Sequence, residues 1–286
     1  MDFPVPGSGP ATVAVPAPGA GAGFWAGAPS AAFAGDGTLV IAYRVRTPDQ
    51  RGASVVVAAS RDGGETLATV ATLDKDRFAA ESLERPALVR LDHGWRMYVS
   101  CATPHSKHWR IDAIDVDDPA GFAETGPRTV FAGDEHVGVK DPVVRRAAGG
   151  WQAWICCHPL DDRGEEDRMT TAYATSRDGL EWTWRGEVLS GRPGRWDSRG
   201  ARVTAVLPDG RASYDGRASK EENFSERTGV ALPGEAGRLQ ASGGAPVANV
   251  RYLDLVAAPD GGYVAFYERP REDGSHELCM ERFPPA

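Results

Sequence analysis

Apolar and β-branched residues along this chain come in short runs, and turns that contain glycine separate the runs. TLVIAYR follows Asp36-Gly37, WRMYVS follows His93-Gly94, and WQAWICCH follows Gly149-Gly150. Weaker copies follow Asp209-Gly210 and Gly261-Gly262. Asp-Gly and Gly-Gly pairs between such runs are strong signals for β-hairpins. A sustained 3.6-residue periodicity is almost missing, so the pattern gives no support to a helical fold.

The glycine turns recur at separations of about 57, 56, 60 and 52 residues, the period of a propeller blade. A short strand candidate such as RPALVRL precedes each turn, and two more, such as SVVVAAS and TLATVATL, follow each hairpin. The pattern therefore predicts an all-β fold, a five-bladed β-propeller whose four-stranded antiparallel blades surround a central channel. We expect residues 1–24, rich in Pro, Gly and Ala, to form an N-terminal arm, and residues 25–286 to form a single propeller domain.

Charged and aromatic residues gather at one end of the predicted strands. In a propeller, the residues that open each first strand and close each second strand meet on one face. A ligand-binding funnel is therefore expected there, although solvated strand ends would show the same charges. The candidate substrate-binding residues are Trp25, Arg44, Arg85, His105, Lys140, His158, Arg199, Tyr214, Arg217, Arg251, Tyr252 and Asp254.

Two strand openings carry a resemblance to known enzymes. Glu84-Arg85-Pro86 and Lys140-Asp141-Pro142 resemble the blade starts of five-bladed glycosidases of families 43, 32 and 130, the arabinanase, invertase and mannoside phosphorylase types. The resemblance implies a glycoside-processing enzyme that acts on a small saccharide in the funnel. Such enzymes use two carboxylates, an acid and a base or nucleophile. Glu84 and Asp141 are the implied catalytic pair, with Asp197, Asp215 and Asp254 in reserve.

The first predicted blade departs from this pattern. The arabinanase and invertase types carry an Asp just before a Pro at that place, whereas this chain has Trp25-Ala26-Gly27-Ala28-Pro29. The phosphorylase type is less affected, because phosphate brings its own nucleophilic oxygen. Arg44, Arg85, Lys140 and Arg199 are candidate ligands of such an anion. However, Arg85 stands where the phosphorylase motif Glu-Asp-Pro-Arg has its Asp.

Composition narrows the remaining classes of function. The formal net charge of −8 argues against nucleic acid or an anionic membrane as a partner. There is no apolar run of about 18 residues and no secretory signal pattern. The four cysteines lack C-x-x-C spacing, so free thiols in the cytoplasm are expected. The histidine spacing predicts no metal, no motif predicts a cofactor, and nothing indicates the oligomeric state.

Two other hypotheses for the function remain open besides a glycoside-processing enzyme. The funnel could belong to a carbohydrate-binding module or pseudo-enzyme, or to an enzyme of another reaction class that reuses the pocket. The polar segment 219–227 follows the second strand of the fourth predicted blade. It is either an ordinary solvated loop or a lid over the funnel, and in the second case Glu222 becomes another candidate acid.

Overall fold

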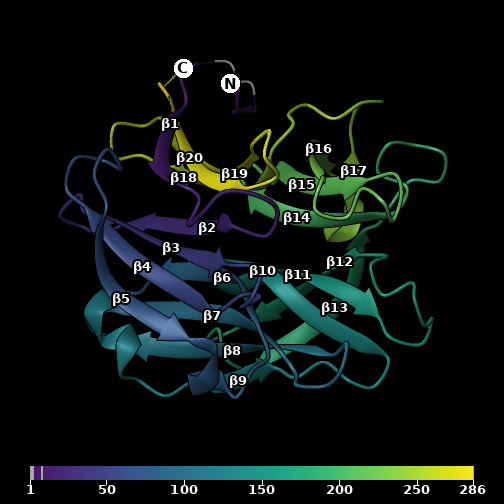
Figure 1. Cartoon of the computed structure of the whole chain (residues 1–286), viewed down its shortest axis with the longest axis horizontal. Helices are drawn as coiled ribbons and strands as arrows, with labels where there is room; N and C mark the ends of the chain where they lie inside the picture. Colours follow the sequence, from purple (N-terminus) through teal and green to yellow (C-terminus); the bar gives the residue numbers. More distant parts are fainter. Residues whose placement is uncertain (1–2, 8, 286) are drawn as a thin grey trace.

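The computed structural model describes residues 3–7 and 9–285, and its regular structure is almost entirely β (Figure 1). Three four-stranded antiparallel sheets have their strands in chain order. They consist of β6 (Leu83–Arg90), β7 (Trp95–Ala102), β8 (Trp109–Val116) and β9 (Arg128–Phe131); β10 (Val137–Ala147), β11 (Gly150–Pro159), β12 (Thr170–Ser176) and β13 (Trp182–Leu189); and β14 (Gly200–Val206), β15 (Ala212–Arg217), β16 (Arg227–Pro233) and β17 (Leu239–Ala241).

The remaining eight strands form one sheet with two antiparallel halves. A single parallel pair, Trp25 with His276, joins the halves. One half contains β2 (Trp25–Phe33), β3 (Leu39–Arg46), β4 (Ser54–Ser60) and β5 (Ala68–Asp74), and the other contains β18 (Arg251–Ala257), β19 (Tyr263–Pro270), β20 (His276–Phe283) and β1 (Thr12–Val15). The predicted all-β class and the four-stranded antiparallel sheets are thus confirmed.

The first strands of these units contact one another in a closed ring. β2 packs on β6, β6 on β10, β10 on β14, β14 on β18, and β18 returns to β2. β1 lies within the segment expected to be an N-terminal arm, and it pairs with β20, where Thr12 lies opposite Met280. The beginning and the end of the described chain therefore meet in one sheet (Figure 1).

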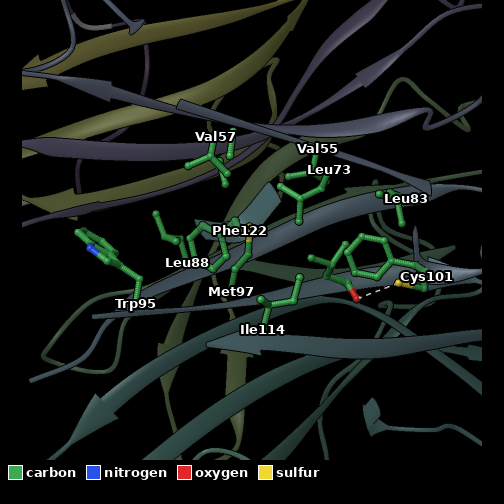
Figure 2. Packing of buried hydrophobic residues seen from close by; sticks show 14 of the residues in the cluster. Val55, Val57, Leu73, Leu83, Leu88, Trp95, Met97, Cys101, Ile114 and Phe122 are labelled. Carbon is green, nitrogen blue, oxygen red and sulfur yellow. Dashed lines mark hydrogen bonds between the residues drawn. The ribbon is translucent and has the colours of Figure 1, made fainter. Parts of the chain in front are cut away.

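Apolar clusters fill the space between neighbouring units. The largest lies between the β2–β5 unit and the β6–β9 sheet (Figure 2). Val55, Leu73, Met97 and Phe122 are fully buried there. Phe122 comes from η2 (Pro119–Ala123), one of the 3-10 helices in the described ranges, with η1 (Lys75–Phe78) and η3 (Glu235–Gly237). Such packing fixes the angle between units, and so fixes where their strand ends meet.

Several strands of the inner ring share a local irregularity near their starts. The pairing register shifts between Gly27 and Ser30 in β2, and between Lys140 and Val143 in β10. β18 has the same shift after Arg251. Inside the shifts, Ala28, Asp141 and Tyr252 have φ values of 51°, 50° and 51°. Left-handed backbone is costly for residues other than glycine, and such bulges redirect side chains.

The helices in the described ranges are short 3-10 turns, and none has the length and apolar character needed to span a bilayer.

Candidate functional site

A pocket of about 560 Å³ opens where the inner strands of several units begin and their second strands end. Its size is within the usual range for small-molecule sites. Of the residues predicted from the sequence, those that line it are Arg44, Glu84, Lys140, His158, Arg217, Arg251 and Tyr252. Those outside the lining are Trp25, Arg85, His105, Asp141, Asp197, Arg199, Tyr214, Asp215 and Asp254.

Several predicted residues outside the lining are held in contacts of their own. Asp197 accepts hydrogen bonds from Tyr214 Oη at 2.7 Å and from Arg192. Arg85 is fully buried and donates to the carbonyl oxygen of Thr204 at 2.6 Å. These side chains connect strands and turns and lie outside the pocket lining.

Three other predicted residues lie at the edges of the site. Arg199 pairs with Asp167, a pocket residue, at 2.7 Å. Trp25 stacks on His276 with 4.5 Å between ring centroids. His105 lies in an exposed turn, where its backbone N–H donates to Glu81.

A chain of alternating carboxylates and guanidinium groups follows the wall of the pocket. Arg44 donates to Glu84 and to Glu268, in both cases at 2.6 Å. Arg251 contacts Glu268 at 2.5 Å and Glu226 at 2.7 Å. All five residues are buried, so each charge depends on its neighbours in the chain for compensation.

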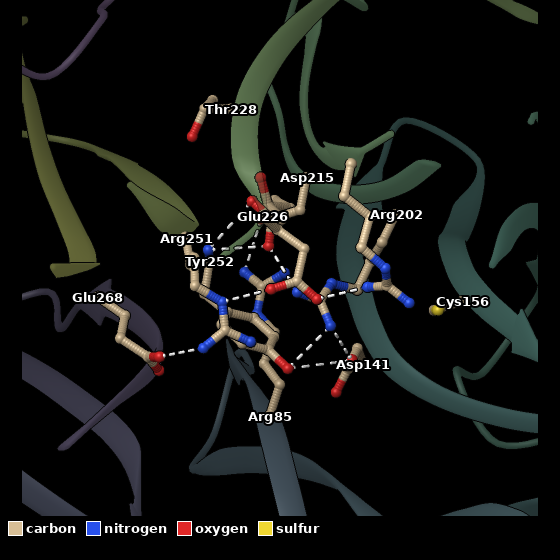
Figure 3. A network of polar contacts seen from close by, with 12 residues as sticks. Arg85, Asp141, Cys156, Arg202, Asp215, Glu226, Thr228, Arg251, Tyr252 and Glu268 are labelled. Atoms are coloured by element: carbon tan, nitrogen blue, oxygen red, sulfur yellow. Dashed lines mark hydrogen bonds and ion pairs between the residues drawn. The ribbon is translucent and has the colours of Figure 1, made fainter. Parts of the chain in front are cut away.

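One branch extends this chain, and a separate cluster around Arg202 adjoins it at the ring of Tyr252. Arg217 donates to Glu226 at 2.6 Å and also contacts Asp167. On the other side, Arg202 donates to Asp141 and to Tyr252 Oη at 2.8 Å each (Figure 3). Its second terminal nitrogen donates to Asp215 at 2.6 Å.

The network decides which carboxyl groups are ionised. Burial by itself would raise the pKa of Glu84, but Arg44 and Lys140 outweigh it and lower that pKa. Burial would also raise the pKa of Asp141, but Lys140 and Arg202 outweigh it and lower that pKa to about 2. Both members of the predicted catalytic pair are therefore anionic at neutral pH.

The carboxyl groups with raised pKa values lie outside the pocket lining. Burial is the main cause for Asp215, whose pKa is raised despite Arg202, and for Asp254, whose pKa is raised to about 6. Inside the lining, the pKa values of Glu84, Glu166, Asp167 and Glu226 are all lowered. A proton donor for a glycosidic oxygen needs a raised pKa, and these four lack it.

His158 faces the pocket as a neutral imidazole. Burial and then Lys140 lower its pKa to about 3. Its Nδ1 lies 2.6 Å from the carbonyl oxygen of Glu166, so Nδ1 carries the proton and donates it there. Nε2 is then the acceptor nitrogen, 3.5 Å from Cys156 Sγ. Among the described residues, no group of three or more His, Cys, Asp or Glu side chains is arranged to hold a metal ion.

The segment 219–227 borders the pocket. Lys220, Asn223, Phe224 and Glu226 belong to the lining. Phe224 packs against Trp25 with 4.9 Å between ring centroids. Glu222 lies outside the lining, where it accepts from the Ala218 N–H at 2.8 Å and pairs with Arg227. The carboxylate that this segment supplies to the pocket is Glu226.

Sequence reasoning missed several residues of the site. Arg202 interrupts the apolar alternation of β14, which was a visible signal. Glu226 is buried at the end of a polar loop, and nothing in the local sequence distinguishes it from Glu222. The other missed side chains that carry charge or an aromatic ring are Arg51, Trp109, Arg163, Glu166 and Asp167.

The closed ring of four-stranded units is a propeller-type fold, and comparison with solved structures shows where else it occurs. A thermostable family-43 glycoside hydrolase matches with a TM-score of 0.69 and 14% identity, over 90% of this chain and 89% of the other. The β-1,2-mannobiose phosphorylase from Listeria innocua matches with a TM-score of 0.62 and 13% identity, over 90% and 89%.

A third match extends the range of chemistries. The sucrose-6-phosphate hydrolase from Lactobacillus gasseri has a TM-score of 0.70 and 12% identity, over 93% of this chain and 60% of the other. No family model and no curated protein sequence matches this chain. The resemblance first drawn from the two strand openings is confirmed as a shared fold, and identities this low establish the fold alone.

Proposed function

We propose that this protein is a glycoside-processing enzyme that binds a small saccharide in the central pocket. The observation that carries the proposal is the position of Glu84, a buried carboxylate at the start of an inner strand and in the pocket lining. Asp141 opens β10, the inner strand that packs on β6, and its charge raises the pKa of Glu84, so the two carboxylates act on each other. Fold likeness to hydrolases and a phosphorylase supports the same class.

The fold proposal is a five-bladed propeller that forms one domain, made of residues 25–286 together with β1 of the segment 1–24. The ring of contacts through β2, β6, β10, β14 and β18 supports five units. β1, from the segment 1–24, supplies the fourth strand of the last unit. The described cysteines are free, which supports the proposal of a reducing, cytoplasmic location.

In the proposed mechanism Glu84 is the carboxylate that contacts the sugar. Its lowered pKa suits a base or nucleophile rather than an acid. Asp141 is fully buried and fixes Arg202 and Tyr252 from behind, so we propose it as a positioning residue. Glu84 cannot also supply the proton for the leaving oxygen in the same step, so a second group must donate it.

One observation favours a second candidate, a saccharide-binding propeller without turnover. All four carboxyl groups in the lining have lowered pKa values, so none is prepared as a proton donor. In that case the arginines and carboxylates would serve as hydrogen-bond partners of sugar hydroxyl groups. The same pocket would bind and release its ligand unchanged.

Glu84→Gln tests the enzyme proposal. Aryl glycosides with arabinofuranosyl, xylosyl, mannosyl and glucuronosyl groups, each with and without phosphate, are screened for release of the aryl alcohol. Because the amide keeps an oxygen for Arg44 but cannot act as a base, we expect turnover to fall at least about 100-fold while binding persists. Glu65→Gln is the matched control, since Glu65 is an exposed glutamate far from the pocket lining.

Both alternatives give distinct results in this assay. Turnover that is equal in Glu84→Gln and the native protein would reject Glu84 as the catalytic carboxylate. Saccharide binding by calorimetry with no release from any aryl glycoside would favour the binding propeller. Release that depends on phosphate would identify the phosphorylase type within the enzyme proposal.

A further inference from the structure

The pocket lining has a positive net charge, whereas the whole protein has a negative net charge. The chain has 32 Lys and Arg against 40 Asp and Glu. The pocket lining has nine Lys and Arg against four Asp and Glu. A concave site with one dominant sign of charge attracts ligands of the other sign.

The deep wall of the pocket does not hold that excess. Its four arginines are neutralised by the ion-pair chain, its branch and the Arg202 cluster, in which each guanidinium contacts two carboxylates. Some of those carboxylates, such as Glu268 and Asp215, lie behind the lining. Counted with these second-layer acids, the deep wall carries no positive surplus.

The surplus lies at the mouth of the pocket. Arg51, Lys107 and Arg163 are exposed lining residues from three separate loops. Within the described part of the chain, none of their side chains makes a hydrogen bond or an ion pair closer than 4 Å. Glu166 is the one carboxylate of the lining outside the ion-pair chain, and three unpaired cations outnumber it.

An aromatic ring stands between this mouth and the deep wall. Trp109 is buried except for its pocket face, and Lys140 Nζ lies 4.8 Å from its ring centroid. The guanidinium carbon of Arg51 lies 5.9 Å from the same ring. Lys140 contacts Asp141 at 3.6 Å, which leaves its ammonium able to take a second partner. Trp109, Lys140 and Glu84 line the same pocket, so a saccharide bound there would meet cations and a carboxylate.

We propose that the mouth formed by Arg51, Lys107 and Arg163 binds an oxyanionic group, a carboxylate or phosphate, of a saccharide ligand in this pocket. This inference rests on the proposed function, which supplies the saccharide. What it adds is that the saccharide is anionic. Guanidinium groups bind such oxyanions in a bidentate manner, and an ammonium adds a point charge. A neutral sugar would leave all three cations without a partner.

Calorimetry with D-glucuronate, glucose 6-phosphate, D-glucose and inorganic phosphate tests the assignment. We expect at least one anionic sugar to bind about tenfold tighter than glucose, with the preference shrinking as salt rises because exposed charges are screened. The double variant Lys107→Gln/Arg163→Gln should abolish this preference. Arg195→Gln, an exposed arginine outside this pocket, is the matched control and should preserve it.

The phosphate arm separates the two sources of the oxyanion. Tight phosphate binding that the double variant removes assigns the mouth to a free anion, whereas sugar acids that bind tighter than phosphate assign it to a substrate-borne group. Either result supports an oxyanion subsite. Equal binding of glucose and the anionic sugars overturns it, as does an anion preference that survives in the double variant. Absence of binding by every anionic probe overturns it as well.

Failure of this inference differs from failure of the proposed function. If aryl glycosides are turned over but glucose and the anionic sugars bind equally, the enzyme proposal stands and the oxyanion subsite is wrong. If anionic sugars bind through the mouth but nothing is turned over, the subsite stands and the enzyme proposal fails. The binding assay and the turnover assay therefore report independently.

Discussion

The starts of β2 and β10 have the same backbone and different chemistry. Each has a residue just before a proline with φ near 50°, Ala28 in β2 and Asp141 in β10, and each lies at a shift of register. Asp141 directs a carboxylate to Arg202. Ala28 offers only a methyl group. The repeat therefore fixes where a side chain is presented, and the individual residue decides whether a charge stands there.

The start of β2 receives its carboxylates from the last unit of the chain instead. Glu268 of β19 lies against Gly27, and a Cβ built on Gly27 would lie 2.5 Å from Glu268 Cγ. Asp254 of β18 accepts the Ala31 N–H at 2.8 Å. The acid that the sequence pattern expected before Pro29 is thus missing from β2, while two acids from neighbouring strands approach it. Neither of them reaches the pocket lining.

Asp141→Ala should give the largest effect on stability. The variant leaves Arg202 buried with Asp215 as its remaining carboxylate, and breaking a buried ion pair costs about 3–5 kcal/mol. Urea unfolding at pH 7 measures the loss. Asp162→Ala, at an exposed aspartate, is the control and should change stability little. A loss below about 1 kcal/mol would show that Asp141 and Ala28 are equivalent in stability as well as in backbone.

Gly27→Ala tests the start of β2, where Glu268 of β19 lies against Gly27. The new methyl group would overlap the Glu268 side chain, which is fully buried and held by Arg44, Arg251 and His276. Because that carboxylate cannot swing into solvent, we expect a loss of about 2–3 kcal/mol in the same unfolding experiment. Gly35→Ala is the control, since its Cβ would meet no atom within 4 Å. Equal stability of the two variants would mean that Glu268 is free to move.

The sequence was sufficient for the repeat and the sheets because their signals are local. A glycine turn and its flanking apolar runs lie within about 15 residues, and they correctly predicted hairpins such as β6–β7 and β10–β11. The order of strands inside each unit follows from short connections. Closure through β1 and β20 joins residues more than 260 positions apart, so no local pattern indicated it.

The site was only partly predictable, for a reason that the strand starts make clear. Adjacent strand residues such as Glu84 and Arg85 point to opposite faces, one into the pocket and one toward Thr204. The register shift between Leu83 and Pro86 affects which of the two faces the pocket. The alternation of residues in the sequence does not reveal where that shift falls. Lining residues from loops, such as Arg163 and Glu226, depend on how loops fold over the ring.

Asp254→Asn should change how stability depends on pH. Burial raises the pKa of Asp254 from 3.8 to about 6 in the folded protein. Between about pH 4 and 6 the folded protein keeps a proton that the unfolded chain has lost, so this group lowers stability as pH rises. The variant should remove a decline of about 2 kcal/mol across that interval, measured as the difference between two urea-unfolding series. Parallel series would show that the Asp254 carboxyl group ionises normally beside β2.

Ala28→Gly should have the smallest effect, because this position contributes backbone geometry and little else. Glycine relieves the left-handed φ of 51° but gains entropy in the unfolded chain and gives up a buried methyl group. These contributions oppose one another, so the free energy of unfolding should change by less than about 1 kcal/mol. Pocket binding should be unaltered, since Ala28 is outside the lining. A loss near that of Asp141→Ala would show instead that the methyl group supports the start of β2 as strongly as the carboxylate supports β10.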